Sequence, residues 1–235
     1  MKKVIVNCKT PFKMRETLLK IGCEIILSNE IDGNNSLIKF HPDIQLHVLD
    51  KKNIVCAPSC YEYYKSILPN EINIIKGKME VDVTYPYDCA YNVARVGEYV
   101  ICNTNTTEKT ILDYYKNQKH IIHVNQGYAK CNICIIDENT ILTEDIGIHN
   151  TIVHSKLQLN SYLIPKGSIL LKHFPYGFIG GASGKIENNL FWYGNISTHP
   201  SYNTIYDIVN KRGVKMISLS SDPVEDFGSI IFLSE

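Results

Sequence analysis

The feature of the sequence that most constrains its fold is a recurring order of elements: strand, strand, helix, strand. The clearest copy is predicted as strand, turn, strand, helix and strand over residues 44–49, 51–53, 54–57, 61–68 and 72–75. Ser59 and Glu62 have the spacing of a capping box, and Pro69 follows the predicted helix. A unit of this size cannot bury its apolar faces alone, so we expect such copies to stack on one another.

Three further copies repeat this order with little sequence identity. Their predicted strand, strand, helix and strand lie at 90–95, 99–102, 107–116 and 120–124; at 130–136, 140–143, 147–155 and 169–171; and at 180–186, 190–193, 200–211 and 214–218. The cap spacing returns at Asn105 and Glu108, and Gly213 is placed to end a helix. Glu144 and Asp145 are interpreted as a helix start, where acidic residues are favoured.

A fifth copy is split between the two ends of the sequence. Its first strand is predicted at 228–233, its second at 4–6, its helix from Thr10-Pro11 to Gly22, and its third strand at 23–27. Sharing one unit between both ends closes a ring and leaves no open sheet edge. The sequence therefore predicts an α/β fold, a five-fold pseudosymmetric propeller of ββαβ units in a single domain, 1–235. An ordinary doubly wound sheet is the alternative, but it gives no reason for ends that are half a unit out of phase.

Composition excludes several classes of protein. The chain has 24 basic and 24 acidic residues and no Lys/Arg run, so we expect no nucleic-acid partner. Its first residues hold too few apolar side chains for a signal peptide, and no segment has the length of a membrane span. We therefore expect a cytoplasmic protein whose eight cysteines are reduced. Most of them, including Cys8, Cys56, Cys102 and Cys134, are expected to be small buried hydrophobes.

In such a ring the loops that lead into the first strands converge on one mouth. These loops are rich in glycine and polar residues, and they span 41–43, 88–92, 126–131, 177–185 and 225–229. Polar groups that converge in one concavity are the default site for a ligand, so we expect a small-molecule partner. No metal or organic cofactor is expected. Cys131 and Cys134 are three apart on a predicted strand and should face opposite sides, and neither a phosphate loop nor a nucleophile elbow is complete around Lys185.

Four segments carry a resemblance to a known fold: 41–45, 126–131, 177–184 and 226–229. Through them the chain resembles an uncharacterised bacterial family with the pentein fold, the architecture of guanidino-group-modifying enzymes. Such enzymes use a cysteine thiolate as nucleophile, a histidine as acid and base, and carboxylates that hold the cationic guanidinium. A thiolate is the attacking species, a histidine near neutrality can protonate the leaving amine, and a planar cation suits bidentate carboxylates.

The resemblance suggests residues for each role. The segment that ends at Cys131 resembles the one that carries the nucleophile, and His41-x-Asp43 resembles the His-x-Asp segment. The catalytic candidates are therefore Cys131, His41 and Asp43, which must lie within hydrogen-bond reach of one another. The residues expected to bind substrate are Asp88, Cys89, Asn92, Tyr128, Lys130, Ser183, Asp226 and Ser229.

The sequence departs from the enzymes in two respects, the first being that their His-x-Asp segment lies in the third unit, whereas His41-x-Asp43 lies in the first. The second concerns the cysteine. The enzymes carry it in the last unit, where this chain has 226–229 and no cysteine, although His41 and Cys131 lie two units apart as in the enzymes. Cys131 is alternatively a small core residue, with Cys89 as a second thiol candidate. His41-Pro-Asp43 is alternatively the entry to a strand, with Asp43 bonding local backbone N–H groups. His199 is alternatively part of a helix start, and Ser183 and Ser229 are alternatively turn residues that bond the backbone. Two hypotheses follow: a cysteine-dependent hydrolase or transferase acting on a guanidine or amidine, and a non-catalytic module that binds a small ligand or a protein.

Overall fold

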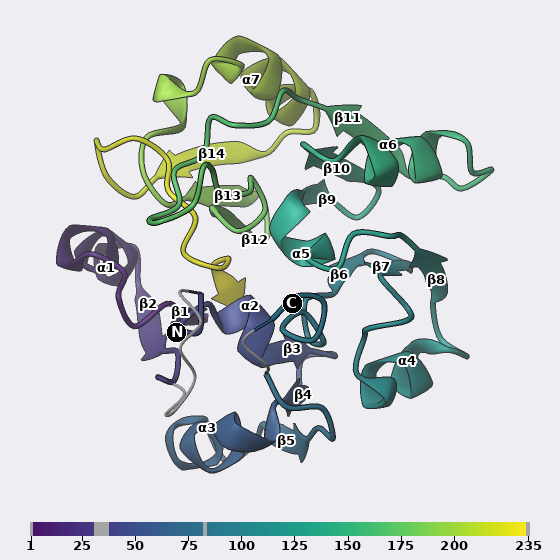
Figure 1. Ribbon diagram of the computed structural model, residues 1–235. Helices are drawn as coiled ribbons and strands as arrows, with labels where there is room; N and C mark the ends of the chain where they lie inside the picture. The colour runs from purple at the N-terminus through teal and green to yellow at the C-terminus, as the bar shows by residue number, and fades with distance from the viewer. Residues whose placement is uncertain (1, 31–37, 82–83, 234–235) are drawn as a thin grey trace.

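A computed structural model describes residues 2–30, 38–81 and 84–233, which form five three-stranded sheets. The first four sheets are β3 (Leu46–Val48), β4 (Asn53–Cys56) and β5 (Asn73–Lys76); β6 (Ala94–Val96), β7 (Tyr99–Cys102) and β8 (His120–His123); β9 (Ile133–Asp137), β10 (Thr140–Thr143) and β11 (Asn160–Leu163); and β12 (Ser183–Ile186), β13 (Asn189–Trp192) and β14 (Lys215–Ser218). The fold is mixed α/β, and Figure 1 shows the sheets arranged about the middle of the molecule, with the longer helices toward the outside and the short helices α2 (Pro42–Gln45) and α5 (Ala129–Asn132) near the middle.

All five sheets have the same topology. The first strand of each unit pairs antiparallel with the second, and the second pairs parallel with the third. A parallel pair needs a crossover, which the helix of each unit supplies. The weak repeat in the sequence is therefore a real repeat of structure.

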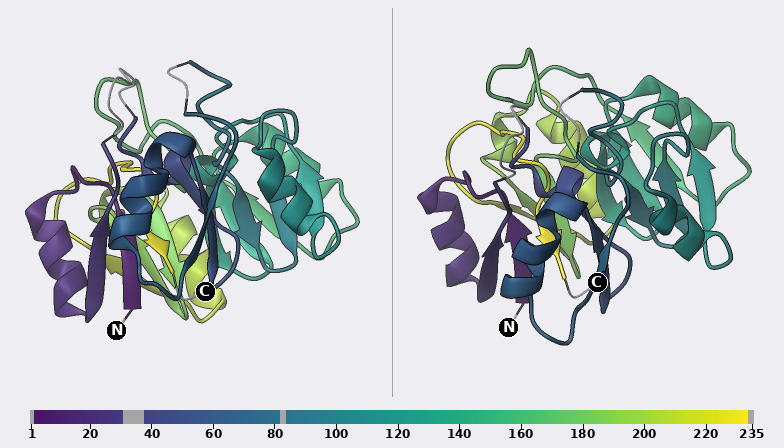
Figure 2. Two further views of the ribbon diagram at one scale, coloured as in Figure 1. Left: turned by 90° about the horizontal axis from the view of Figure 1, so that it is seen from below. Right: turned by 60° about the horizontal axis from the view of Figure 1, so that its bottom comes forward.

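The fifth sheet joins the two ends of the chain. It consists of β15 (Ile231–Phe232), β1 (Lys2–Val6) and β2 (Cys23–Leu27), and Val4 lies opposite Phe232 in its antiparallel pair. The prediction that both ends share one unit is confirmed. Figure 2 shows the N and C labels on one side of the molecule and the long connection 164–182 on the other.

The helices of the units each bury a narrow face. They are α1 (Phe12–Lys20), α3 (Tyr61–Ile67), α4 (Lys109–Tyr115), α6 (Ile146–Val153) and α7 (Tyr202–Lys211). Four of them bury two residues four apart: Met14 and Leu18, Ile111 and Tyr115, Ile148 and Ile152, Ile205 and Val209. Residues four apart share a helix face, so each helix covers its own sheet through one stripe.

Some predicted elements are wrong in detail. The third strand of the third unit is Asn160–Leu163, not 169–171, and Leu170 forms only an isolated bridge with Glu225. Two predicted first strands begin as short helices, α2 (Pro42–Gln45) and α5 (Ala129–Asn132). Ser59 lies in a 3-10 helix (Pro58–Cys60) and bonds Glu80 instead of capping α3, whereas Glu108 itself caps α4. Asp145 caps α6 as expected.

No helix in the described part of the chain is long and apolar enough to span a membrane. The single-domain boundary and the cytoplasmic location stay predictions.

Candidate functional site

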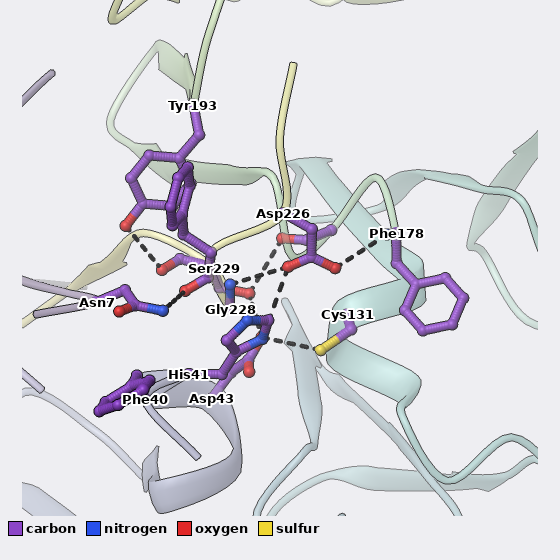
Figure 3. A network of polar contacts seen from close by, with 12 residues as sticks. Asn7, Phe40, His41, Asp43, Cys131, Phe178, Tyr193, Asp226, Gly228 and Ser229 are labelled. Carbon is purple, nitrogen blue, oxygen red and sulfur yellow. Dashed lines mark hydrogen bonds and ion pairs between the residues drawn. The ribbon is translucent and has the colours of Figure 1, made fainter. Parts of the chain in front are cut away.

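The two short helices α2 and α5 and the segment before β15 bring one group of polar side chains together. His41 is the N-cap of α2, Asp43 lies within it, and Cys131 lies in α5. Cys131 comes from a different unit than His41 and Asp43, and Figure 3 shows the three meeting with Asp226 and Ser229. We call this set the mouth cluster; it consists of His41, Asp43, Asn92, Lys130, Cys131, Asp226 and Ser229.

Cys131 is held by two side chains. Its thiol donates to Asp43 Oδ2 at 3.1 Å, and Asn92 Nδ2 donates to its Sγ at 3.0 Å. The other end of the Asn92 amide accepts from the Cys131 backbone N–H at 3.0 Å. Cys131 is 3% exposed and Asn92 is 1% exposed. The thiol is therefore fixed in position next to a carboxylate, as a catalytic or ligand-binding thiol would have to be.

Asp43 links Cys131 to a second chain of contacts. Ser229 Oγ donates to Asp43 Oδ2 at 2.6 Å, and Lys130 Nζ donates to Ser229 Oγ at 3.0 Å. Ser229 is fully buried and has a φ of 68°, a strained value for a residue with a side chain. Among the described residues, Asp43 Oδ1 has no hydrogen-bond partner. The two oxygens of this buried carboxylate therefore differ, since Oδ2 accepts two hydrogen bonds and Oδ1 accepts none from the described residues.

His41 faces a second carboxylate. Its Nδ1 lies 3.8 Å from Asp226 Oδ1, and Asp226 accepts from the backbone N–H of Phe178 and of Gly228, both at 2.9 Å. Gly228 has a φ of 81°, and a Cβ there would collide with His41. A Cβ at Gly181 would likewise collide with the Asp226 carboxylate. Glycine is therefore required at both positions for these side chains to occupy their places.

Burial sets the protonation of the cluster. It raises the pKa of Asp43, raises that of Asp226 to about 6 and lowers that of His41 to about 4. Burial, followed by the charges of Asp43 and Asp226, holds the pKa of Cys131 well above its usual range. Without a ligand the thiol is therefore protonated. A cation between the two carboxylates would act in the opposite direction, because it favours every anionic form around it.

Three predicted residues form a neighbouring group. Tyr128 OH donates to Asp88 Oδ2, and Cys89 Sγ donates to Pro86 O at 2.8 Å. Burial raises the pKa of Cys89 to about 11, so this thiol is also protonated.

Ser183 lies instead in β12, where its hydroxyl donates to Gly180 O at 3.4 Å. It lines a pocket of about 130 Å³ that we call the central pocket, to which β3, β6, β9, β12 and β15 all contribute.

Glu144 is a residue that the sequence analysis assigned only to a helix start. It is 7% exposed, its Oε2 accepts from Ile179 N at 2.8 Å, and burial raises its pKa to about 7. It lines a hollow of about 610 Å³ together with Asn132 and Phe178, which adjoin Cys131 and Asp226. An acidic residue placed directly after the second strand of a unit was the signal available in the sequence.

His199 lies outside the mouth cluster, and the described residues show no group of metal ligands. His199 Nδ1 accepts from Ser201 N at 3.0 Å just before α7, the local role that was the alternative to function. In the part of the chain that the structure describes, no three His, Cys, Asp or Glu residues are grouped so as to hold a metal ion. The absence of a cofactor stays a prediction.

Comparisons with known proteins give a family and a fold. A family model described as "Family of unknown function (DUF6873)" matches residues 5–231. No curated protein matches the chain. Among solved structures, DDAH from Pseudomonas aeruginosa, a mutant in complex with citrulline, is similar with a TM-score of 0.58 and 7% identity, over 94% of this chain and 92% of that one.

Two further solved structures have the same fold. SxtG, an amidinotransferase from Microseira wollei in the saxitoxin biosynthetic pathway, is similar with a TM-score of 0.56 and 11% identity, over 94% of this chain and 88% of that one. Agmatine deiminase from C. jejuni is similar with a TM-score of 0.50 and 14% identity, over 92% and 74%. At such low identity the likeness shows the fold alone, which is the pentein fold.

Proposed function

We propose that this chain, which belongs to the family of unknown function whose model spans residues 5–231, is a cysteine-dependent hydrolase or transferase. Its substrate would be a small metabolite that bears a guanidine or amidine. The observation that carries the proposal is the buried contact of 3.1 Å between the Cys131 thiol and Asp43, next to His41 and Asp226. The structural neighbours, which include an amidinotransferase and an agmatine deiminase, support the same class of chemistry.

The charge of the mouth cluster favours a cationic substrate. Asp43 and Asp226 are 2% and 3% exposed, and burial raises the pKa of both. Two desolvated carboxylates are costly unless a positive charge accompanies them. A planar guanidinium would supply that charge and would present N–H donors to Asp43 Oδ1, the oxygen without a partner among the described residues.

The reaction begins when the bound cation lowers the pKa of Cys131. The thiol gives its proton to Asp43, and the sulfur forms a bond to the guanidinium carbon. The bond from this carbon to the leaving amine then breaks, and the amine departs with the proton that Asp43 received. Water attacks the same carbon and gives a proton to His41, which is held beside Asp226. The sulfur leaves the carbon and takes this proton back as the thiol; a transferase uses an acceptor amine in place of water.

The remainder of the substrate would lie in the hollow beside Glu144. Phe178 lines this hollow, and its backbone N–H also bonds Asp226, so the hollow and the mouth cluster share a wall. Cys131 and His41 are almost fully buried, so binding requires this wall to move. Phe178 and Tyr128 lie against each other with ring centroids 6.2 Å apart, and they are the side chains that we expect to shift.

We also propose that the five sheets close into a propeller-like ring. The first strands of all five units line the central pocket, and β12 contacts both β9 and β15. If the ring is closed, a chain that ends at Gly228 and lacks β15 will lose stability throughout. Unchanged amide exchange in the other four sheets of that truncated chain would argue against closure.

The catalytic proposal is tested with a panel of guanidines and amidines and two cysteine variants. Cys131→Ala should abolish turnover of any compound that the protein converts. Cys134→Ala is the matched control, because Cys134 is equally buried but lies next to Ser183, outside the mouth cluster. Full activity of the Cys131→Ala variant would rule out the thiol mechanism.

A non-catalytic binding function is the second candidate. The observation that favours it is the thiol of Cys131, which is buried among carboxylates instead of cations and has a strongly raised pKa. Thermal-shift screening with amino-acid and polyamine-like ligands distinguishes the two functions. Binding without turnover, together with no labelling of Cys131 by a thiol-reactive amidine, would favour the binding function.

A further inference from the structure

The central pocket differs in charge from the mouth cluster. Its lining includes Arg95 from β6, Lys185 from β12 and Lys130 from α5. Among the described residues, Asp43 is the only acidic side chain that lines it, and that carboxylate already bonds Ser229 and Cys131. The pocket therefore has an excess of positive charge.

Two of these cations lack an acidic partner in contact. Lys130 Nζ donates to Ser229 Oγ and Gly180 O, both neutral oxygens, at 3.0 and 3.3 Å. Within residues 2–30, 38–81 and 84–233, neither Lys130 nor Lys185 takes part in an ion pair. Both lysines are half-buried, so their ammonium groups lose part of their hydration.

The pKa of His47 is lowered by burial and then by the positive charges that line the central pocket. His47 lines the pocket, is 6% exposed and lies 3.1 Å from Tyr115 OH through its Nε2. Burial first, and then the charge of Arg95, lowers its pKa to about 3, and Lys130 acts in the same direction. At neutral pH His47 therefore adds no charge and can present a polar ring to a ligand.

We infer that the central pocket binds a small oxyanion, phosphate or a carboxylate, through Lys185, Arg95 and Lys130. A volume of about 130 Å³ suits one such anion and is well below the ~300 Å³ at which pockets for larger ligands begin. Strands from all five sheets form its wall, so a bound anion would tie the sheets together. The site shares Lys130 and Asp43 with the mouth cluster, but Lys185 and Arg95 lie outside that cluster.

The test is isothermal titration calorimetry of the full chain with inorganic phosphate, and with acetate in a parallel titration. Lys185→Gln should weaken phosphate binding at least about tenfold, the effect of removing one charge-assisted hydrogen bond. Lys52→Gln is the matched control, since Lys52 is exposed at the turn between β3 and β4. Tighter binding of phosphate than of acetate would indicate a phosphate site, and the reverse a carboxylate site.

Other outcomes overturn the inference. If neither anion binds, or if the Lys185→Gln and Lys52→Gln variants bind as the unaltered chain does, the central pocket is not an anion site. Cys131→Ala is included because it should abolish turnover and leave phosphate binding unchanged. Failure of the anion site and failure of the thiol mechanism are thus separate results.

Discussion

The mouth cluster and the central pocket share Lys130 and Asp43 but are built for opposite charges. The mouth cluster holds Asp43 and Asp226, both almost fully buried. The central pocket holds Lys185 and Arg95, both half-buried. Desolvation is costlier for the more buried groups, and burial is the largest cause of the raised pKa of Asp43 and of Asp226. Adjacent regions of one fold can therefore be prepared for ligands of opposite sign.

The largest expected effect is at the backbone that holds the mouth cluster rigid. Gly228→Ala places a Cβ against His41 at a φ of 81° and should lower the free energy of unfolding by about 2–5 kcal/mol, from backbone strain and overpacking together. Urea unfolding measures the loss. Gly213→Ala, at a φ of 69° in open space, should show the strain alone. Equal losses of unfolding free energy in the two variants would mean that His41 moves aside for the added Cβ at no measurable cost.

The second effect tests whether burial raises the pKa of Asp226 in the mouth cluster. The pKa of Asp226 is about 6 in the folded chain and 3.8 otherwise, so the folded state binds more protons and stability falls as pH rises from about 4 to 6. The Asp226→Asn variant has no carboxyl at this position and so does not lose stability by this titration. Its free energy of unfolding relative to the unaltered chain should rise by about 3 kcal/mol from about pH 4 to 6 and stay constant at higher pH. A flat difference between pH 4 and 7 would contradict the raised pKa.

The third effect concerns selectivity between the two regions. Asp43→Asn keeps the size of the side chain and removes its charge, so methylguanidinium should bind about 10–100-fold more weakly. Phosphate binding should not weaken, because an acidic group has been removed from the central pocket. Calorimetric titrations with both ligands measure this. Asp113→Asn on the exposed face of α4 is the control, and a loss of phosphate binding in Asp43→Asn would show that the regions are not separate.

The smallest effect is expected at Lys130, which belongs to both the mouth cluster and the central pocket. Lys130 lowers the pKa of both Asp43 and Asp226. In Lys130→Gln, the pH midpoint of methylguanidinium binding should therefore move upward, by less than about one pH unit, and phosphate should bind more weakly. Titrations between pH 5 and 8 measure the midpoint. A change confined to one ligand would place Lys130 in only one of the two regions.

The outer parts of the units could be predicted from the sequence because local patterns define them. Cys23–Leu27, Tyr99–Cys102 and Thr140–Thr143 are apolar runs between turns, and their bounds were predicted as the structure has them. Asn160–Leu163 was missed because it lies at a sheet edge and is largely exposed, so it carries no apolar run. The apolar stretch 169–171 was chosen in its place.

The site could be predicted only in part. The mouth loops were identified by their glycine and polar residues, and seven of the eleven predicted site residues meet in the mouth cluster. The helices α2 and α5 span four residues each, too few for a helical period to be visible. The pairing of Cys131 with Asp43 joins residues 88 apart in the chain, so it depends on how the sheets are arranged. Glu144 was missed because an acid before a helix has an ordinary local explanation.

The sheet shared by the two ends of the chain has a consequence for how such a molecule can vary. Because Val4 pairs with Phe232, both ends of the chain lie in one sheet. If the five sheets close into the ring that we propose, a circular permutant opened between β5 and β6 would keep the contacts of the mouth cluster. Position along the chain and position in the molecule are then separate properties. A proposed nucleophile in the third unit rather than the last is compatible with such a ring, since a ring assigns no unit to be first.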